Sequence, residues 1–358
     1  MPKLIMHRNF QVPKDELTRA IEGAEPGQLI FQIGPTGVGK TTMRHAVLRT
    51  IFGSPEHWGP GRVPAIEVMA LLQNQAYFTS FGLVDSLLGE LFAPDLHWLL
   101  DGGSDSPSVL RIISEVAESR KIWETRPRQT QPERKAWEQF GQLAKNRSMR
   151  LASIDQAAAL CTNHKNTSPA DHILNLMSIA EKHRLNILLS GVHTIAQLWN
   201  TRAEIRRRSI IVWVPPYSFV RPTDRDPFLQ LLRTLGSRYR LSKPRLLYDM
   251  AAVILAATAG IYGIVEKLLK DASVKAAGAG RGEIRKVDIE ASVYGDADLR
   301  QLWEDVHAFE EARKEGSTKA QASVVVAKWN LPSPRQGKSK KGAAEAVRAN
   351  DVPQGTVA

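Results

Sequence analysis

The stretch from Gly34 to Thr42 has the residue types and spacing of a phosphate-binding loop, since it fits the pattern G-x-x-x-x-G-K-[ST] at every fixed position. Glycines let the backbone fold around a phosphate chain, and amide groups at the start of the following helix face the anion. Lys40 is placed to reach the β- and γ-phosphates, and Thr41 to offer its hydroxyl to a magnesium ion. We predict a site for ATP and Mg²⁺ whose nucleotide-binding residues are Gly34, Pro35, Thr36, Gly37, Val38, Gly39, Lys40, Thr41 and Thr42.

The magnesium ion also needs a carboxylate at the end of a neighbouring strand. Asp155 is the candidate, because it ends the apolar run that begins at Leu151, although the same carboxylate could instead cap a following helix. The next position, where a glutamate usually orients the attacking water, holds Gln156. A glutamine is a poor general base, so we expect slow hydrolysis. Alternatively, Gln156 positions the water without taking its proton, or another acid such as Glu67 acts.

Two further groups follow along the chain. Ser190 ends the next apolar run and is the candidate for a polar group beside the γ-phosphate, with a plain strand-to-loop turn as the alternative. An arginine cluster precedes the last apolar run, and one of its members could reach the γ-phosphate of a neighbouring subunit as a fixed cation. A solvated or nucleic-acid-facing helix end is the other interpretation. The cluster comprises Arg202, Arg206, Arg207 and Arg208, with Arg206 and Arg207 as the main candidates for this finger.

The secondary structure must bring these groups to one place. Apolar runs of strand length alternate with helical patterns from about residue 17 to residue 215, which predicts an α/β fold with a parallel sheet and helices on both faces. The phosphate loop lies between a predicted strand at 28–33 and a predicted helix at 41–52, as its chemistry requires. Other strands are expected at 65–70, 149–154, 185–190 and 210–214, and other helices at 13–21, 79–92, 110–144 with a break at 126–132, and 173–183.

The character of the chain changes after this region. From residue 227 the strand pattern is lost, and helical patterns follow at 228–235 and 246–271, the second with a break at Gly260. Beyond residue 316 the composition turns to Ser, Pro, Gly, Lys and Ala, which cannot bury a core. We therefore expect a nucleotide-binding domain at 1–220, a small all-helical lid domain at 221–315 and a disordered basic tail at 316–358.

The chain of 358 residues carries a formal net charge of +11, a surplus that attracts polyanions such as DNA. Many of the basic residues fall between Arg202 and Arg245, although a solvated basic surface would have the same composition. The longest apolar run, at 250–265, is shorter than the roughly 20 residues that a membrane-spanning helix needs. The beginning of the chain has no signal pattern, and the single Cys161 fits a reducing compartment. We expect a cytoplasmic protein without a membrane segment.

The order of phosphate loop, Asp155 strand, Ser190 strand, arginine cluster and helical lid resembles that of AAA+ ATPases. More narrowly, the chain resembles the TniB/TnsC/MuB-type regulators of DNA transposition. The likeness rests on GPTGVGKTT, on LNILLSGVHTIAQL, on the segment from Val214 to Pro216, and on the stretches 226–232 and 260–265. It departs from the family at Gln156, where an Asp-Glu pair is common, and in the lid, where Tyr262 or Lys267 stands in place of a sensor arginine.

This resemblance implies an ATP-dependent protein that binds double-stranded DNA without sequence preference. It also implies assembly into a homo-oligomer, as a ring or helical filament, and partnership with a transposase and target-selection proteins. The alternative is a signalling or defence P-loop ATPase that switches a protein partner without DNA. A metabolic kinase is disfavoured because no second-substrate signature is present, and a GTPase because no Asn-Lys-x-Asp stretch occurs.

Overall fold

We describe the fold from a computed structural model of the chain. The described residues are 5–70, 78–96, 98–99, 107–125, 132–162, 168–200 and 202–317. Most of the helix break predicted at 126–132 and most of the tail predicted from 316 lie outside these ranges.

The described residues form a five-stranded sheet in the order β2-β3-β4-β1-β5. Every pairing between neighbouring strands is parallel. Parallel sheets are covered on both faces, and this explains why their strands appear in the sequence as nearly continuous apolar runs. All five predicted strands are confirmed to within two residues, with the bounds β1 Leu29–Ile33, β2 Ala65–Met69, β3 Leu151–Asp155, β4 Asn186–Gly191 and β5 Ser209–Trp213.

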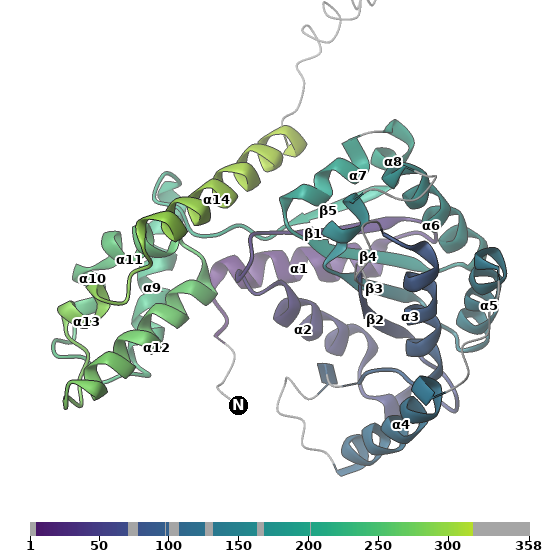
Figure 1. Cartoon of the computed structure of the whole chain (residues 1–358), viewed down its shortest axis with the longest axis horizontal. Coiled ribbons are helices and arrows are strands. Elements are labelled where there is room, and N and C mark those ends of the chain that lie inside the picture. Colours follow the sequence, from purple (N-terminus) through teal and green to yellow (C-terminus); the bar gives the residue numbers. More distant parts are fainter. Residues whose placement is uncertain are drawn as a thin grey trace, which may run out of the picture. The chain divides into compact units, whose positions relative to one another are not determined.

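Helices cover both faces of this sheet (Figure 1). Alternate residues of β1 point to opposite sides, so that Ile30 packs with α1 and α2 while Phe31 packs with α3, α5 and α6. This two-faced arrangement confirms the predicted fold class. The helices of this region are α1 Arg8–Gly23, α2 Lys40–Phe52, α3 Ser80–Phe92, α4 Pro107–Thr125, α5 Glu133–Asn146, α6 Pro169–His183, α7 Gln197–Asn200 and α8 Ala203–Arg207.

Helix α1 begins five residues before the predicted start at Pro13. A proline inside a helix lacks the N–H for one backbone hydrogen bond, and this favoured the later start. Contacts from outside the helix outweigh that loss. The Asn9 side chain donates hydrogen bonds to the carbonyl oxygens of Pro215 and Pro216, and Phe10 is buried in an apolar cluster with Val38.

The described residues after β5, up to residue 317, are mainly helical, and their helices bury a hydrophobic cluster of their own that includes Phe228, Ile254 and Leu269. The helix predicted at 246–271 is divided into three. One break falls at Gly260, where φ is +69° and an added Cβ would lie 1.9 Å from the carbonyl oxygen of Tyr217. The helices are α9 Arg225–Gly236, α10 Leu246–Asp249, α11 Ala251–Thr258, α12 Tyr262–Gly278, α13 Lys286–Glu290 and α14 Asp296–Ser317.

The described residues up to Arg313 belong to one compact unit, so the predicted domain boundaries at 220 and 315 stay predictions. Within the described ranges, no single helix has the length and apolar character to cross a membrane. Helices α11 and α12 meet that test only together, as a pair bent by 113°.

Candidate nucleotide-binding site

The phosphate loop lies between the end of β1 at Ile33 and the start of α2 at Lys40. Its glycines are required by geometry. Gly37 and Gly39 have φ of +88° and +94°, in the left-handed region that side chains disfavour. An added Cβ at Gly34 would lie 2.5 Å from the carbonyl oxygen of Val214. The loop can therefore bring its backbone amides close to a phosphate chain.

The Lys40 side chain lies back over this loop. Its Nζ donates hydrogen bonds to the carbonyl oxygens of Gly34, at 2.7 Å, and Pro35, at 2.9 Å. Burial lowers the pKa of Lys40 to about 8, and the charge of Asp155 offsets only part of this effect. The ammonium group is thus held at the loop, where a bound phosphate would restore its preference for the charged form.

Thr41 and Asp155 meet, as the sequence predicts for two groups that hold magnesium. The Thr41 hydroxyl donates a hydrogen bond to Asp155 Oδ2 at 3.2 Å, and Asp155 Oδ1 accepts one from the Gln156 amide at 2.8 Å. A hydroxyl and a carboxylate are oxygen donors of the kind that Mg²⁺ prefers. These residues fit a magnesium ion bound with a triphosphate.

Arg44 is a member of this site that the sequence analysis did not identify. Arg44 belongs to α2, and its side chain is fully buried. Its Nη2 donates hydrogen bonds to Glu67 Oε1 at 2.7 Å and to Asp155 Oδ2 at 2.8 Å. Nε donates a third, to Glu67 Oε2 at 3.0 Å. Burial raises the pKa of the Asp155 carboxyl, but the hydrogen bond and charge of Arg44 outweigh it and hold that pKa below its usual value.

Glu67, the alternative acid considered from the sequence, is engaged by this arginine and by His45 at 3.1 Å. Burial raises the pKa of Glu67, but the hydrogen bonds from His45 and Arg44 lower it to about 2. A carboxylate with so low a pKa is a weak base. In this geometry, Glu67 supports other residues and is poorly suited to take a proton from water.

A cavity of about 880 Å³ lies against the phosphate loop. Its walls come from the loop, from the ends of β3 and β4, and from the first turns of α12. The residues that line it are Thr36, Gly37, Gly39, Lys40, Thr41, Thr42, Ala70, Asp155, Gln156, Ala158, Ala159, Thr162, Gly191, Val192, Tyr262, Gly263 and Glu266.

The remaining predicted residues have different places. Gln156 lines the cavity in a left-handed backbone conformation with φ of 53°. Ser190 is fully buried and is not among the lining residues, whereas the next two residues, Gly191 and Val192, form part of the wall. Lys267 bonds to the hydroxyl of Tyr294 and is not among the lining residues.

The arginine cluster lies away from this cavity, on and beside α8. Arg202 pairs with Asp171 at 2.5 Å and Arg208 with Glu181 at 2.6 Å. Arg206 lies over the ring of Trp199, and Arg207 is exposed. Within one chain, the described structure does not bring any of these arginines to the phosphate loop.

No family model matches this chain, and no curated protein matches it. Solved structures do, and each covers most of the chain. The ORC2 protein of Aeropyrum pernix, in complexes with ADPNP and ADP, is 15% identical over 90% of this chain and 89% of its own, with a TM-score of 0.49. The Holliday junction branch migration motor RuvB of Thermotoga maritima is 11% identical over 90% and 82%, with a TM-score of 0.43. The Walker-type ATPase paby2304 of Pyrococcus abyssi is 15% identical over 91% and 90%, with a TM-score of 0.45.

The fold class follows from the strand order of the chain itself and from the place of the phosphate loop in it. A phosphate loop joins an inner parallel strand, β1, to the helix that follows it, and an extra strand, β4, separates β1 from β3, the strand that ends in Asp155. The chain has the fold of a P-loop NTPase.

Proposed function

We propose that this chain is an AAA+ ATPase that binds double-stranded DNA without sequence preference and assembles on it as a homo-oligomer. In this proposal the assembly recruits or activates a transposase at a target site. The observation that carries the nucleotide part is the meeting of Lys40, Thr41 and Asp155 at one cavity. The transposition part depends on the sequence resemblance described above.

Each residue of the site has a role in ATP binding. The phosphate loop amides and Lys40 would hold the triphosphate, and Thr41 and Asp155 would hold Mg²⁺, which neutralises charge on the phosphates when bound. Gln156 lies at the cavity wall but cannot accept a proton as a carboxylate would. We therefore propose a switch that binds ATP firmly and hydrolyses it slowly.

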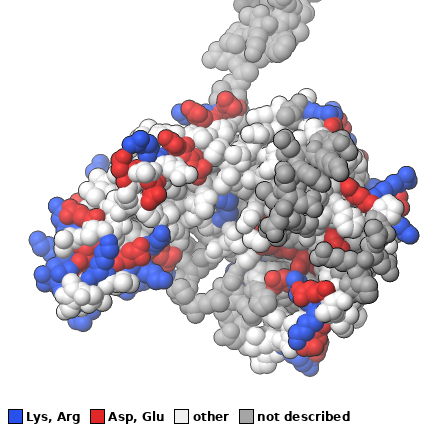
Figure 2. All heavy atoms as spheres, viewed as in Figure 1, with Lys and Arg blue, Asp and Glu red and all other residues white. Residues whose placement is uncertain are grey.

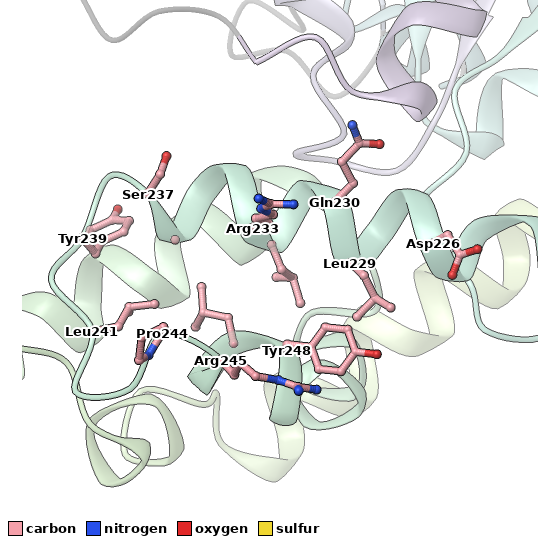
Figure 3. Close-up of a pocket in the computed structure, with 13 residues that line it drawn as sticks. Asp226, Leu229, Gln230, Arg233, Ser237, Tyr239, Leu241, Pro244, Arg245 and Tyr248 are labelled. Carbon is pink, nitrogen blue, oxygen red and sulfur yellow. The ribbon is translucent and has the colours of Figure 1, made fainter.

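A groove in the helical part, whose charged lining residues are two arginines and one aspartate, supports DNA as the partner. Between α9 and α10 lies a cavity of about 940 Å³ (Figure 3). Arg233 lines it from α9, while Arg245 and Tyr248 line it from the opposite side, with the Arg245 guanidinium 4.8 Å from the centre of the Tyr248 ring. Basic side chains and an exposed aromatic ring are groups that contact phosphates and bases.

The segment that forms this groove has more basic than acidic residues. From Arg221 to Arg245 there are seven basic and two acidic residues, and both acidic ones precede Pro227. The exposed Arg233, Arg240 and Lys243 have no ion pair with the described residues. Figure 2 shows Lys and Arg gathered over the helical part at the left, with Asp and Glu among them. We propose that the rim of the groove contacts the DNA backbone.

Binding of the full chain to two labelled duplexes of unrelated sequence, measured by fluorescence anisotropy, tests this function. With Mg²⁺ and a non-hydrolysable ATP analogue, we expect similar affinity for both duplexes, and a fall of orders of magnitude when salt rises from about 50 to 200 mM. Without nucleotide, the affinity should be much lower. Nucleotide binding without any retention of DNA would favour the signalling or defence ATPase instead.

A charge reversal tests the groove itself. The variant carrying Arg233→Glu and Arg245→Glu should lose at least about tenfold in DNA affinity and show a shallower salt dependence. The matched control, with the same change in net charge, carries Arg111→Glu and Arg134→Glu, at exposed arginines of α4 and α5. Equal losses in the two proteins would show that only net charge matters, and would exclude this groove as the contact surface.

A further inference from the structure

A row of polar groups lies where an apolar sheet face is expected. Ala65 of β2 and Leu151 of β3 pack in the cluster under α2, so Glu67 and Ser153, two residues further along, point to the same side. Asp155 continues this row at the end of β3. Two carboxylates under a helix are costly unless a cation compensates them.

Arg44 supplies that cation with a geometry that a point charge could not reproduce. Its planar guanidinium holds both oxygens of Glu67 through Nε and Nη2 and still reaches Asp155 through Nη2. Its Nη1 is buried without a hydrogen-bond partner among the described residues, so the two carboxylates alone fix the group. The helix that starts at the phosphate loop is thereby tied to two adjacent strands.

The Asp155 carboxylate is consequently held in one orientation. Oδ2 accepts from Arg44 and from Thr41, and Oδ1 accepts from the Gln156 amide. Glu67 in turn is steadied by His45, the neighbour of Arg44 on α2. Each oxygen that could face a magnesium ion or its water is thus placed before any ligand arrives.

We propose that Arg44, clamped on Glu67, is a positioning residue for magnesium: it aims the Asp155 carboxylate at the metal site beside Thr41. It touches neither phosphate nor metal in this role, and it acts only through Asp155. Groups that orient metal ligands in this way typically contribute about 10–100-fold to metal affinity. This inference rests on the ATP and Mg²⁺ binding proposed above.

The test separates magnesium from nucleotide. The affinity for a non-hydrolysable ATP analogue is measured by calorimetry with Mg²⁺ and with EDTA, and the ratio gives the gain due to magnesium. In Arg44→Lys, which keeps the charge but cannot span both carboxylates, we expect this gain to fall about 10–100-fold. Affinity in EDTA should change much less. Glu67→Gln removes the clamp from the other side and should shift the ratio in the same direction.

Arg49→Lys is the matched control, since Arg49 lies on the same helix but bonds to the carbonyl oxygen of Trp98, and it should keep the full gain. Equal losses with Mg²⁺ and with EDTA in Arg44→Lys, or an unchanged gain in both Arg44→Lys and Glu67→Gln, would overturn the inference. If Arg44→Lys does not fold, Glu67→Gln alone decides. An unmodified chain that binds no nucleotide would instead refute the proposed function.

Discussion

The amide of Gly263, at the start of α12, donates a hydrogen bond to the carbonyl oxygen of Gly37 in the middle of the phosphate loop, at 2.9 Å. The two residues are far apart in sequence, and the contact is close enough that an added Cβ on Gly263 would lie 2.7 Å from that same oxygen. The helical part of the chain therefore takes its position directly from the loop that would hold the phosphates.

We predict that Gly263→Ala weakens binding of ATP by about tenfold, because its methyl group must push α12 or the loop aside, and overpacking of this kind costs about 1–3 kcal/mol. The control is Gly278→Ala on the same helix, where an added Cβ meets nothing within 4 Å. Equilibrium titration with a fluorescent ATP analogue measures both. Unchanged affinity in Gly263→Ala would mean that α12 moves without affecting the loop.

Lys40→Ala should lower ATP affinity by at least about a hundredfold, because it removes a cation that makes charge-assisted hydrogen bonds to phosphate. DNA binding that requires ATP should be lost with it. Lys145→Ala, at an exposed lysine of α5, serves as the control. Equilibrium binding is the measurement, and an ATP affinity within a few-fold of the unmodified chain would refute the site.

The lowered pKa of Lys40 predicts a pH dependence of ATP binding. In the free chain the ammonium group loses its proton near pH 8, and a triphosphate favours the charged form. Above pH 8, binding must therefore take up a proton, and affinity should fall by up to about tenfold per pH unit. Calorimetry at pH 9 in two buffers of different ionisation enthalpy measures this proton. Its absence would show that Lys40 stays charged in the free chain.

The lowered pKa of Lys40 also makes the free energy of unfolding depend on pH. Between pH about 8, the lowered pKa of Lys40, and pH 10.5, the ordinary pKa of a lysine, the unfolded chain holds a proton that the folded chain has released. In that window, the contribution of Lys40 to the free energy of unfolding should rise with pH, because the cost of burying its charge disappears.

Gln156→Glu should raise the rate of ATP hydrolysis several-fold, since it places a carboxylate at the cavity wall where a general base can contribute about 10²–10⁴-fold at best. The assembly on DNA should become shorter-lived as ATP is consumed faster. Phosphate release and the lifetime of the DNA complex are measured together. Brisk hydrolysis in the unmodified chain, unchanged by Gln156→Glu, would mean that another residue activates the water.

Most of the sheet could be predicted because five apolar runs match the burial of a parallel sheet on both faces. The phosphate loop could be predicted because its glycines are required by local backbone geometry, which a short motif records. The start of α1 could not, since it depends on Asn9 reaching the carbonyl oxygens of Pro215 and Pro216, which are distant in sequence.

Arg44 could have been suspected but not assigned. Glu67 interrupts an otherwise apolar strand, and a buried carboxylate needs a cation. The strand order decides which cation serves it, because β2 lies beside β3 and under α2 only in the folded sheet. Likewise, nothing in the local sequence shows that Ser190 is buried while Gly191 lines the cavity.

The place of β1 between β4 and β5 also sets the order in which the sheet can be completed during synthesis. β1 ends at Ile33, but its two neighbours begin only at Asn186 and Ser209. On the ribosome, the phosphate loop is finished long before either flanking strand exists, and contacts across so long a separation form slowly. Until then, an apolar strand has two open edges that can pair with other chains. A chain that stops before β4 should therefore aggregate rather than act as a small nucleotide-binding unit.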